Sequence, residues 1–370
     1  MKIVHISTVH GAFDDRIFYK ECVSLANYGY ETHLIVPHTK NETISGVKIH
    51  SIAKHSSRID RVIKGNKEAG KVAFDLNADV YHLHDPELLP LGLKLKKMGK
   101  KVIFDMHELV YHTIMQKDWI PFLFRWIVSR AYLYFEKKAF NMFDHFIVVT
   151  SQMKDEYIAK SYPKQLIKTT VIRNLTILKM VDDAQPIKKT GQETILIYAG
   201  GLSLSRGLKE VILAIQNIDN VKFWLLGPWS SEGYQKECEQ ADINHKVDYK
   251  GMVRLDEVYN YMKAADIGMA VLHPTTNHLA SLPVKSFEYM ASKIPQIMSD
   301  FPFWQESFSD CALFVKYDNI ESISTAINDL VNNPAIAKEI GSKGYEMIKN
   351  EFSWEQEAVQ LINIYKNLKA

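Results

Sequence analysis

Short apolar runs alternate with amphipathic helical stretches along almost the whole chain. Near the N-terminus, Lys2–Ser7, Glu31–Pro37 and Lys101–Met106 are strand-like, and Asp15–Tyr28 has the periodicity of a helix that stops at Gly29. Further strands are predicted at Asp79–Leu83, Phe146–Thr150 and Thr170–Arg173. Apolar strands separated by helices are typical of parallel α/β layers, so we expect an α/β fold.

The same alternation restarts after a polar, aperiodic stretch. Lys179–Glu193 contains Pro186 and Gly191, and we interpret it as an interdomain linker. Beyond it, strands are predicted at Thr194–Ala199, Val221–Leu226, Lys246–Lys250, Asp266–Val271, Pro295–Ser299 and Ala312–Val315. Helices are predicted at Leu208–Asn217, Leu255–Ala264, Val284–Ala291, Ile320–Asn332 and Trp354–Leu368. The pattern therefore predicts two consecutive Rossmann-like halves.

Length and composition agree with such an organisation. At roughly 150 residues a domain, 370 residues make two or three domains. The net charge of +2 gives no reason to expect nucleic acid as a partner. Cys22, Cys238 and Cys311 lie too far apart for a disulfide framework or a zinc site, so we expect a cytoplasmic protein.

The sequence predicts neither a signal peptide nor a membrane span. The N-terminal apolar stretch is short and alternates with polar residues, and no uncharged run approaches ~20 residues. Trp119–Phe135 is aromatic and is interrupted by Arg125 and Arg130. It predicts either a helix lying against a membrane surface or a helix packed on the core, and the sequence favours the second.

A glycine-rich loop follows the strand at Thr194–Ala199. Gly200 and Gly201 end the strand, and Arg206 precedes a helix. Glycines let a ligand approach the backbone, a helix N-terminus offers unpaired N–H groups, and a guanidinium binds phosphate oxygens. The loop is a candidate diphosphate site, although a plain Gly-Gly turn fits the pattern equally well.

A second candidate surrounds the helix predicted at Val284–Ala291. Ser281, Leu282 and Pro283 precede this helix, so their backbone amides could face anionic oxygens. Glu288 lies one turn from Lys285, where its carboxylate could bind a ribose diol. The alternative is a surface Lys–Glu pair of little energetic weight.

Other strand ends carry polar residues or glycines. Gly227 ends the LLGP segment, and Met252 and Val253 follow another strand, where their backbone could hold a base. In open α/β sheets ligands bind at the carboxyl ends of strands. In the first half such residues are His10, Gly11, His84, Asp85, His107, Glu108 and Ser151. Asp14, Asp15 and Arg16 open the first helix, where helix capping and acceptor contact are equally good interpretations.

In order and spacing, eight segments resemble the GT-B glycosyltransferases of family 4, a large retaining family that uses nucleotide sugars. The segments span essentially the whole chain: HGAFDDRIFYKECVSLANYGYETHLI, HLHDPELL, IFDMHE, FIVVTSQM, YAGGLSLSRGL, LLGP, YKGMVRLDEVYNYMKAADIGMAVL and LPVKSFEYMASKIPQIMSD. The resemblance implies two Rossmann-like domains facing across a deep cleft. It implies an acceptor-side domain over 1–180, a donor-binding domain over 193–350, and a helix over 351–370 that crosses back to the first domain.

The resemblance also implies residue roles. Arg206 matches the cation that neutralises the donor diphosphate, and Glu288 matches the second glutamate of the E-x7-E motif, which binds ribose. His107 matches a histidine that lines the reaction centre, so these three form the expected catalytic set. Expected donor-binding residues are Gly11, Gly200, Gly201, Gly227, Met252, Val253, Ser281, Leu282, Pro283 and Lys285. Expected acceptor-side residues are Asp15, His84 and Glu108.

Two positions depart from the family pattern. Ala280 stands where the first glutamate of E-x7-E is expected, and Gly201 stands where many relatives carry an arginine. We interpret both as altered donor handling. They also leave open a non-catalytic partner subunit, while a GT-B nucleotide-sugar 2-epimerase is the other alternative. The P-loop, GxSxG, HExxH and GxGxxG motifs are absent from the sequence.

The implied reaction needs no cofactor besides its nucleotide-sugar donor, which we expect to be UDP- or GDP-linked. The leaving phosphate can take the acceptor proton, and no Asp-x-Asp occurs, so we predict a metal-independent transferase. A metal cluster of His82, His84 and His107 is disfavoured by the lack of a matching Cys or carboxylate spacing. The aromatic and basic stretch from Trp119 suits a lipid-linked saccharide acceptor, used for bacterial surface polysaccharide at the inner face of the plasma membrane.

Overall fold

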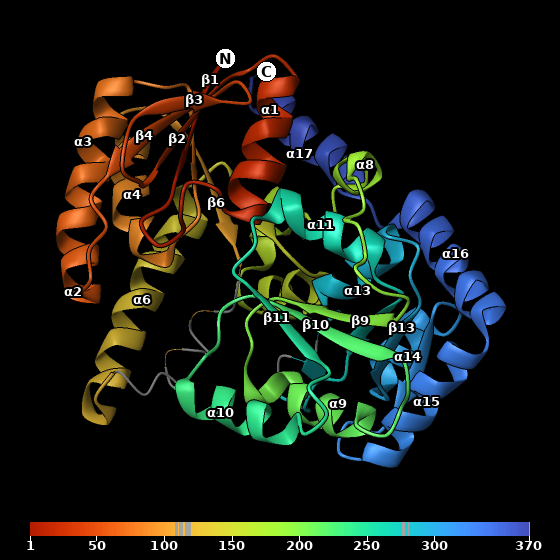
Figure 1. Ribbon diagram of the computed structural model, residues 1–370. Helices are drawn as coiled ribbons and strands as arrows, with labels where there is room; N and C mark the ends of the chain where they lie inside the picture. Colours follow the sequence, from red (N-terminus) through yellow and green to blue (C-terminus); the bar gives the residue numbers. More distant parts are fainter. Residues whose placement is uncertain (108–109, 111–113, 115–119, 276–277, 280, 370) are drawn as a thin grey trace. The chain divides into compact units, whose positions relative to one another are not determined.

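The computed structural model describes residues 1–107, 110, 114, 120–275, 278–279 and 281–369. The chain divides into two compact units, Met1–Asn174 with Gln356–Ala370, and Leu175–Glu355. Each unit is built around one mainly parallel sheet (Figure 1), which confirms the predicted α/β class. The last residues of the chain belong to the first unit.

The sheet of the first unit has the strand order β3-β4-β2-β1-β5-β6-β7-β8, with β3 antiparallel to β4 and the other neighbours parallel. Its strands are β1 (Lys2–Ile6), β2 (Glu31–Pro37), β3 (Glu42–Ile44), β4 (Val47–Ile52), β5 (Val80–Leu83), β6 (Lys101–Met106), β7 (His145–Val148) and β8 (Thr169–Val171). Its helical segments are η1 (Asp15–Cys22), α1 (Val23–Asn27), α2 (Arg58–Asp60), η2 (Arg61–Gly65), α3 (Asn66–Leu76), η3 (Pro86–Leu88), α4 (Leu89–Lys97), α6 (Phe122–Met142), η4 (Met153–Ile158), α7 (Ala159–Ser161), η5 (Pro163–Lys168) and most of α17 (Trp354–Lys369).

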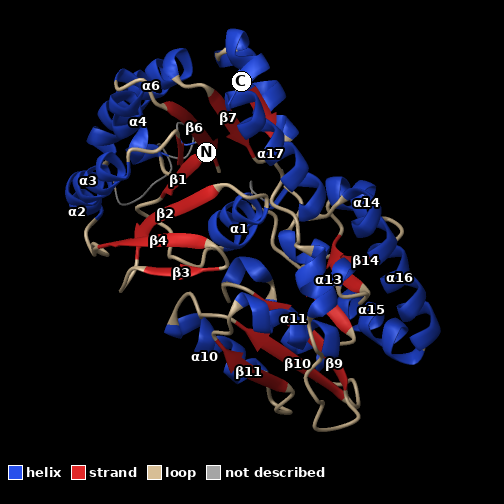
Figure 2. Cartoon of the chain, turned by 90° about the horizontal axis from the view of Figure 1, so that it is seen from above, coloured by secondary structure: helices blue, strands red, loops and turns tan. Residues whose placement is uncertain are grey.

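The sheet of the second unit is parallel throughout, in the order β11-β10-β9-β12-β13-β14. Figure 2 shows its strands β11, β10 and β9 side by side. Its strands are β9 (Thr194–Ala199), β10 (Val221–Leu226), β11 (Val247–Gly251), β12 (Ile267–Ala270), β13 (Gln296–Ser299) and β14 (Ala312–Val315). Its helical segments are α8 (Leu178–Asp183), η6 (Leu204–Arg206), α9 (Leu208–Ile215), α10 (Glu232–Ala241), α11 (Leu255–Ala264), α13 (Val284–Ala291), α14 (Pro302–Phe308), α15 (Ile320–Asn332) and α16 (Pro334–Glu351).

Helices cover the sheets, which explains why the strands are apolar on both faces. In β1 the residues from Ile3 to Ile6 are all buried, and in β9 Leu196 and Ile197 are fully buried although they point to opposite faces. A parallel strand buried on both sides needs continuous rather than alternating apolar character. Such runs are recognisable in the sequence, and these strands lie where they were predicted.

A hairpin in the first unit was not predicted. β3 and β4 pair antiparallel around Ser45 and Gly46, whose φ angles are +51° and +78°. A two-residue turn with positive φ at both positions matches the twist of a hairpin. Strand β4 of the hairpin pairs with β2, so the hairpin extends the predicted parallel sheet at that edge.

The linker prediction for Lys179–Glu193 is wrong in its first part. Leu178–Asp183 forms α8, and Val181 is fully buried in the core of the second unit. The chain passes from the first unit to the second at Asn174–Leu175 instead. A single buried valine in a polar stretch holds this helix against the core. One apolar residue does not produce a helical periodicity, so the sequence did not indicate the helix.

Helix α6 covers the aromatic stretch that raised the question of membrane contact; Trp119 lies outside the described residues. One face of α6 contributes Ala139 and Phe140 to the core of the first unit, while Trp126 and Ile127 are more than half exposed. Of the helices that the structure describes, none has the length and apolar character needed to cross a membrane.

Candidate active site

The strand order of the second unit defines where a ligand can bind. β9 lies beside β10 on one side and β12 on the other, so the chain turns in opposite directions after these two central strands. Open α/β sheets bind ligands at the carboxyl ends of strands at this switch point. The loop from Gly200 to Gly207 leaves β9 there, and residues from Val271 leave β12. His273 N donates to Ser205 O at 2.9 Å, which joins the two loops.

Glycines shape this switch-point cluster. Gly200, Gly207 and Gly227 have φ angles of +140°, +61° and +130°, which residues other than glycine rarely adopt. A Cβ on Gly227 would also collide with Gly200 O, and one on Gly207 with Val271 O. Gly200 N donates to Leu226 O at 2.8 Å and Gly227 N donates to Gly251 O at 2.7 Å, so hydrogen bonds join the ends of β9, β10 and β11. Gly207 and Gly227 are buried and Gly200 is half-buried, so the loops pack against each other in a way that only glycines permit.

Arg206 is fixed beside these loops. Its Nη1 lies 3.3 Å from His278 Nε2, and His278 Nδ1 lies 2.7 Å from His273 O. Because Nδ1 must donate to that carbonyl, Nε2 accepts from Arg206. Burial lowers the pKa of His278, so the imidazole stays neutral and the guanidinium provides the charge. Arg206 Nε is buried and has no hydrogen-bond partner among the described residues.

A second cation, Lys285 of α13, meets the same loops. Its Nζ lies 5.0 Å from the ring centroid of Tyr198, and a Cβ on Gly200 would collide with it. Burial lowers the pKa of Lys285, while the charge of Glu288 raises it and that of Arg206 lowers it. The predicted residues Arg206, Lys285 and Glu288 are therefore electrostatic neighbours at the end of β9.

The remaining predicted donor residues lie around this cluster. Ser281 O accepts a hydrogen bond from Trp304 Nε1 at 2.8 Å, which holds the segment before α13. Leu282 packs against the core, and Pro283 immediately precedes the helix. Val253 is partly buried, whereas Met252 is 83% exposed. Gly201 is exposed, and Ala280 lies outside the described residues.

In the first unit, the switch point lies between β1 and β5. A pocket of about 460 Å³ opens there and is lined by His10, His84, Asp105 and His107, among others. His107 Nε2 lies 3.2 Å from Asp105 Oδ2, so the carboxylate orients the imidazole. The predicted reaction-centre histidine thus has a buried positioning partner.

Asp105 belongs to a buried ion pair that the sequence analysis missed. Its two oxygens accept from Arg16 Nε at 2.9 Å and Nη2 at 3.2 Å, and Arg16 Nη1 donates to Ile172 O at 3.0 Å. Burial opposes the ionisation of Asp105, but the Arg16 guanidinium outweighs it and holds the pKa well below its usual range. The Asp two residues before His107, in FDMHE, was the available signal.

His10 is a further pocket residue with a charged partner. Its Nδ1 lies 2.8 Å from Asp14 Oδ2, while Asp14 Oδ1 accepts from the N–H groups of Arg16 and Ile17. Burial works against the charged imidazole, but Asp14 outweighs it and raises the pKa of His10. Despite the opposing effect of burial, the hydrogen bond with His10 lowers the pKa of Asp14 to about 2. Asp14 therefore caps η1, as the capping interpretation predicts.

The predicted acceptor-side residues have different surroundings. The side chain of His84 is fully buried and points into the unit, and Asp15 Oδ2 pairs with Lys20 Nζ at 2.5 Å. Gly11 is exposed with open space around its Cα. Glu108 lies outside the described residues. The pocket therefore gathers His107 and His84, and Asp15 is engaged in a local ion pair.

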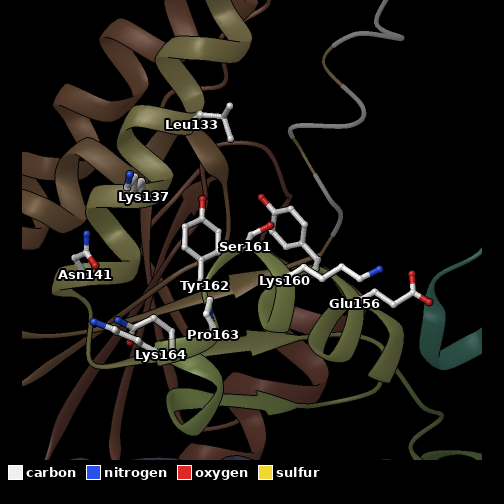
Figure 3. Close-up of a pocket in the computed structure, with 11 residues that line it drawn as sticks. Leu133, Lys137, Asn141, Glu156, Lys160, Ser161, Tyr162, Pro163 and Lys164 are labelled. Atoms are coloured by element: carbon white, nitrogen blue, oxygen red, sulfur yellow. The ribbon is translucent and has the colours of Figure 1, made fainter.

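A pocket of about 790 Å³ also opens in the first unit, between α6 and the segment from η4 to η5 (Figure 3). Lys137, Lys160 and Lys164 line it. Tyr157 and Tyr162 donate their hydroxyls to the carboxylate of Glu136 at 2.5 and 2.7 Å. None of the catalytic, donor-binding or acceptor-side residues predicted from the sequence lines this pocket.

Two units with Rossmann-like strand orders, the second carrying a cationic glycine-rich loop cluster, define the GT-B class of glycosyltransferase fold. Two family models match the chain, "Glycosyltransferase Family 4" over residues 16–175 and "Glycosyl transferases group 1" over residues 181–347. The chain belongs to the group 1 glycosyltransferases of family 4 type, as its sequence motifs suggest.

Individual relatives agree with the family. An uncharacterised glycosyltransferase of Methanocaldococcus jannaschii is 22% identical over 52% of this chain, but only half of that relative is covered. The O-antigen chain mannosyltransferase RfbU of Salmonella typhimurium is 25% identical over 66% of this chain and 69% of its own length.

Solved structures support the fold. Sucrose-phosphate synthase from Thermosynechococcus elongatus matches with a TM-score of 0.74 at 16% identity, over 99% of this chain and 98% of its own. Anabaena HepE in complex with UDP-glucose matches with a TM-score of 0.71 at 12% identity, over 99% and 100%. The GT-B fold predicted from the sequence is therefore confirmed.

Proposed function

We propose that this chain is a retaining glycosyltransferase that moves a sugar from a UDP- or GDP-linked donor to a glycan or lipid-linked saccharide. The observation that carries the proposal is the convergence of Arg206 and Lys285 on the glycine-rich loops at the switch point of the second unit. Two cations beside a glycine-rich loop suit a diphosphate, because guanidinium, ammonium and N–H groups all bind phosphate oxygens.

The same cluster supports metal-independent catalysis. As the bond from the sugar to the diphosphate breaks, negative charge grows on the phosphate oxygens and positive charge on the sugar. Arg206 and Lys285 stabilise the phosphate charge where it develops, which is the role that a divalent ion takes in other transferases. The acceptor hydroxyl attacks from the face that the diphosphate leaves, and the leaving phosphate accepts its proton.

Glu288 and Lys285 complete the proposed donor site. Glu288 is the proposed ribose ligand, because a carboxylate can accept from both hydroxyls of the diol. Lys285 approaches Gly200, next to the position where relatives carry an arginine and this chain has Gly201. We assign Lys285 as the cation that compensates for that glycine.

In the first unit, His107 is the proposed reaction-centre residue. Asp105 holds its Nε2, which leaves Nδ1 for the substrate. The pocket that His107 lines is the proposed acceptor pocket. We propose that Asp15 and His84 support the structure around that pocket and do not contact the acceptor, since Asp15 pairs with Lys20 and His84 is buried.

An apolar groove beside this pocket supports a lipid-linked acceptor. It measures about 530 Å³ and is lined by α2, η2 and α6, including Ile59, Ile63 and Ile127, each more than half exposed. Segments 58–67 and 122–142 carry four basic and one acidic residue each. An apolar surface with a basic surround suits the anionic inner face of a bacterial membrane. The similarity to an O-antigen transferase favours surface polysaccharide synthesis.

Flotation with vesicles containing anionic phospholipid tests the membrane contact. We expect the full chain to float at low salt, and the double variant Trp126→Ala/Ile127→Ala to float several-fold less, because it loses exposed apolar area. Ile243→Ala, at a 71% exposed position of the second unit, is the matched control. Equal flotation of both variants, or none by the parent chain, contradicts membrane contact through α6.

A panel of UDP-, GDP- and dTDP-linked sugars tests the transferase itself. One base is expected to raise the melting temperature, because ligand binding to the folded state stabilises it. With that donor and a lipid-linked saccharide, nucleoside diphosphate should be released together with a glycosylated product. Conversion of UDP-N-acetylglucosamine without acceptor would favour the 2-epimerase instead, and no shift with any nucleotide would favour a non-catalytic subunit.

A further inference from the structure

Four buried side chains meet inside the first unit, away from its surface. His5 belongs to β1, His82 to β5, His84 follows β5, and Glu21 belongs to η1. Glu21 Oε2 lies 3.7 Å from His5 Nδ1, 3.8 Å from His82 Nδ1 and 3.8 Å from His84 Nε2. His5 Nδ1 lies 2.9 Å from His84 Nε2. Atoms that bind zinc tetrahedrally at 2.0–2.2 Å are about 3.3–3.5 Å apart, which is close to these separations.

The polar atoms of this cluster are poorly satisfied by the protein. Both oxygens of Glu21 and His82 Nε2 are buried and have no hydrogen-bond partner among the described residues. Oε1 of Glu21 does lie 3.1 Å from Arg16 Nε, but Arg16 is already committed to Asp105. A buried carboxylate without donors is costly, whereas a divalent cation would compensate its charge.

One outer contact of the cluster is of the kind that metal ligands usually make. Metal-bound histidines typically donate their second ring N–H to a carboxylate or another oxygen. His5 Nε2 lies 3.2 Å from the hydroxyl of Tyr365, which leaves His5 Nδ1 to bind a metal. His84 Nδ1 lies 3.6 Å from Asp105 Oδ2, too far for a hydrogen bond, and His84 Nε2 faces Glu21. His82 Nδ1 also faces Glu21 and lies 2.7 Å from the Tyr365 hydroxyl, a contact that a bound metal would replace.

We propose that His5, Glu21, His82 and His84 form a structural site for one divalent transition-metal ion, with zinc as the best fit. Three imidazole nitrogens and one carboxylate oxygen are a ligand set that zinc favours, and four protein ligands leave no position for a substrate. The site joins β1, β5 and η1, and Tyr365 connects it to α17. It is independent of glycosyl transfer, which we propose to be metal-free.

Metal content of the full chain, purified without a metal-affinity column, tests the proposal. We expect about one zinc per chain by elemental analysis after growth with zinc. Chelator treatment should lower the melting temperature, and added zinc should restore it. Cobalt added to the chelator-treated protein should give the visible absorption of a four-coordinate site with nitrogen and oxygen ligands.

Two variants locate the metal. Glu21→Gln keeps the shape of the side chain but removes its charge, and should weaken zinc binding about 100-fold or more. His50→Gln is the control, because it changes another histidine pair of the same sheet: His50 Nε2 lies 2.8 Å from His33 Nδ1, and His33 Nε2 lies 3.2 Å from Glu31 Oε1. If Glu21→Gln does not fold, the zinc content and the zinc-dependent melting temperature of the parent chain still test the proposal. The proposal is overturned if the chain contains less than about 0.1 zinc and its melting temperature does not change with zinc. It is also overturned if His50→Gln weakens zinc binding as much as Glu21→Gln does.

Discussion

Replacing Arg206 by alanine should lower the rate of glycosyl transfer by about 10²–10³-fold, the effect of removing one preorganised charge from a transition state. Arg206 is held by His278 beside Gly200 and Gly207, where the proposed diphosphate develops negative charge. Donor binding should weaken less than the rate, because the charge is larger in the transition state than in the bound donor. Steady-state kinetics with the preferred donor separates the two effects.

A neighbouring lysine provides the control for Arg206→Ala. Lys209, the second residue of α9, pairs with Glu237 on the surface, 3.0 Å away. Lys209→Ala should leave the transfer rate within about twofold, because an exposed ion pair contributes little. Arg206→Lys should restore part of the rate. If Arg206→Ala and Lys209→Ala behave alike, the diphosphate is bound elsewhere.

Asp105→Ala should destabilise the first unit by about 3–5 kcal/mol, the usual cost of removing one partner of a buried ion pair. Arg16 is buried, and Asp105 accepts hydrogen bonds from two of its N–H groups. His107 would lose its positioning carboxylate at the same time. Urea unfolding of the full chain measures the effect as a lower midpoint for the transition of the first unit.

An exposed aspartate in the same unit is the control for Asp105→Ala. Asp60 pairs with Lys64 across one turn at 2.9 Å, and both side chains are largely exposed. Asp60→Ala should change stability by no more than about 0.5 kcal/mol. An Asp105→Ala variant as stable as Asp60→Ala would show that Arg16 reaches water in solution. The buried ion pair would then be an incorrect description.

Most of the fold is predictable from the sequence, because both sheets are buried and their strands are continuously apolar. Glu31–Pro37, Thr194–Ala199 and Val221–Leu226 were predicted with the bounds that the structure has. The β3–β4 hairpin and α8 were missed. The hairpin depends on a Ser-Gly turn, and α8 depends on a single buried valine. Neither feature produces a long periodic pattern in the sequence.

The candidate site was predictable where it is local in sequence. Gly200 and Arg206 lie in one loop, so their proximity follows from the chain itself. Lys285 was predicted as a donor residue, but its approach to Gly200 depends on how α13 packs beside β9. Its compensation for Gly201 could therefore not be read from either segment alone.

The buried histidine cluster shows the same limit more strongly. His82 and His84 share one strand end, and the sequence analysis set them with His107 as a disfavoured metal cluster. The structure groups both with His5 and Glu21, from elements more than 60 residues away, and it also groups His84 with Asp105 and His107. Parallel strands bring distant segments together, so a ligand spacing along the chain could not reveal the carboxylate.

The central claim is that the second unit binds the donor diphosphate at its glycine-rich switch-point cluster. Amide hydrogen exchange of the full chain, with and without UDP or GDP, tests it most directly. We predict that one of these nucleotides protects the segments Gly200–Gly207 and Ser281–Glu288 from exchange. Protection confined to the first unit, or binding of the nucleotide with no protection in either segment, would contradict the account.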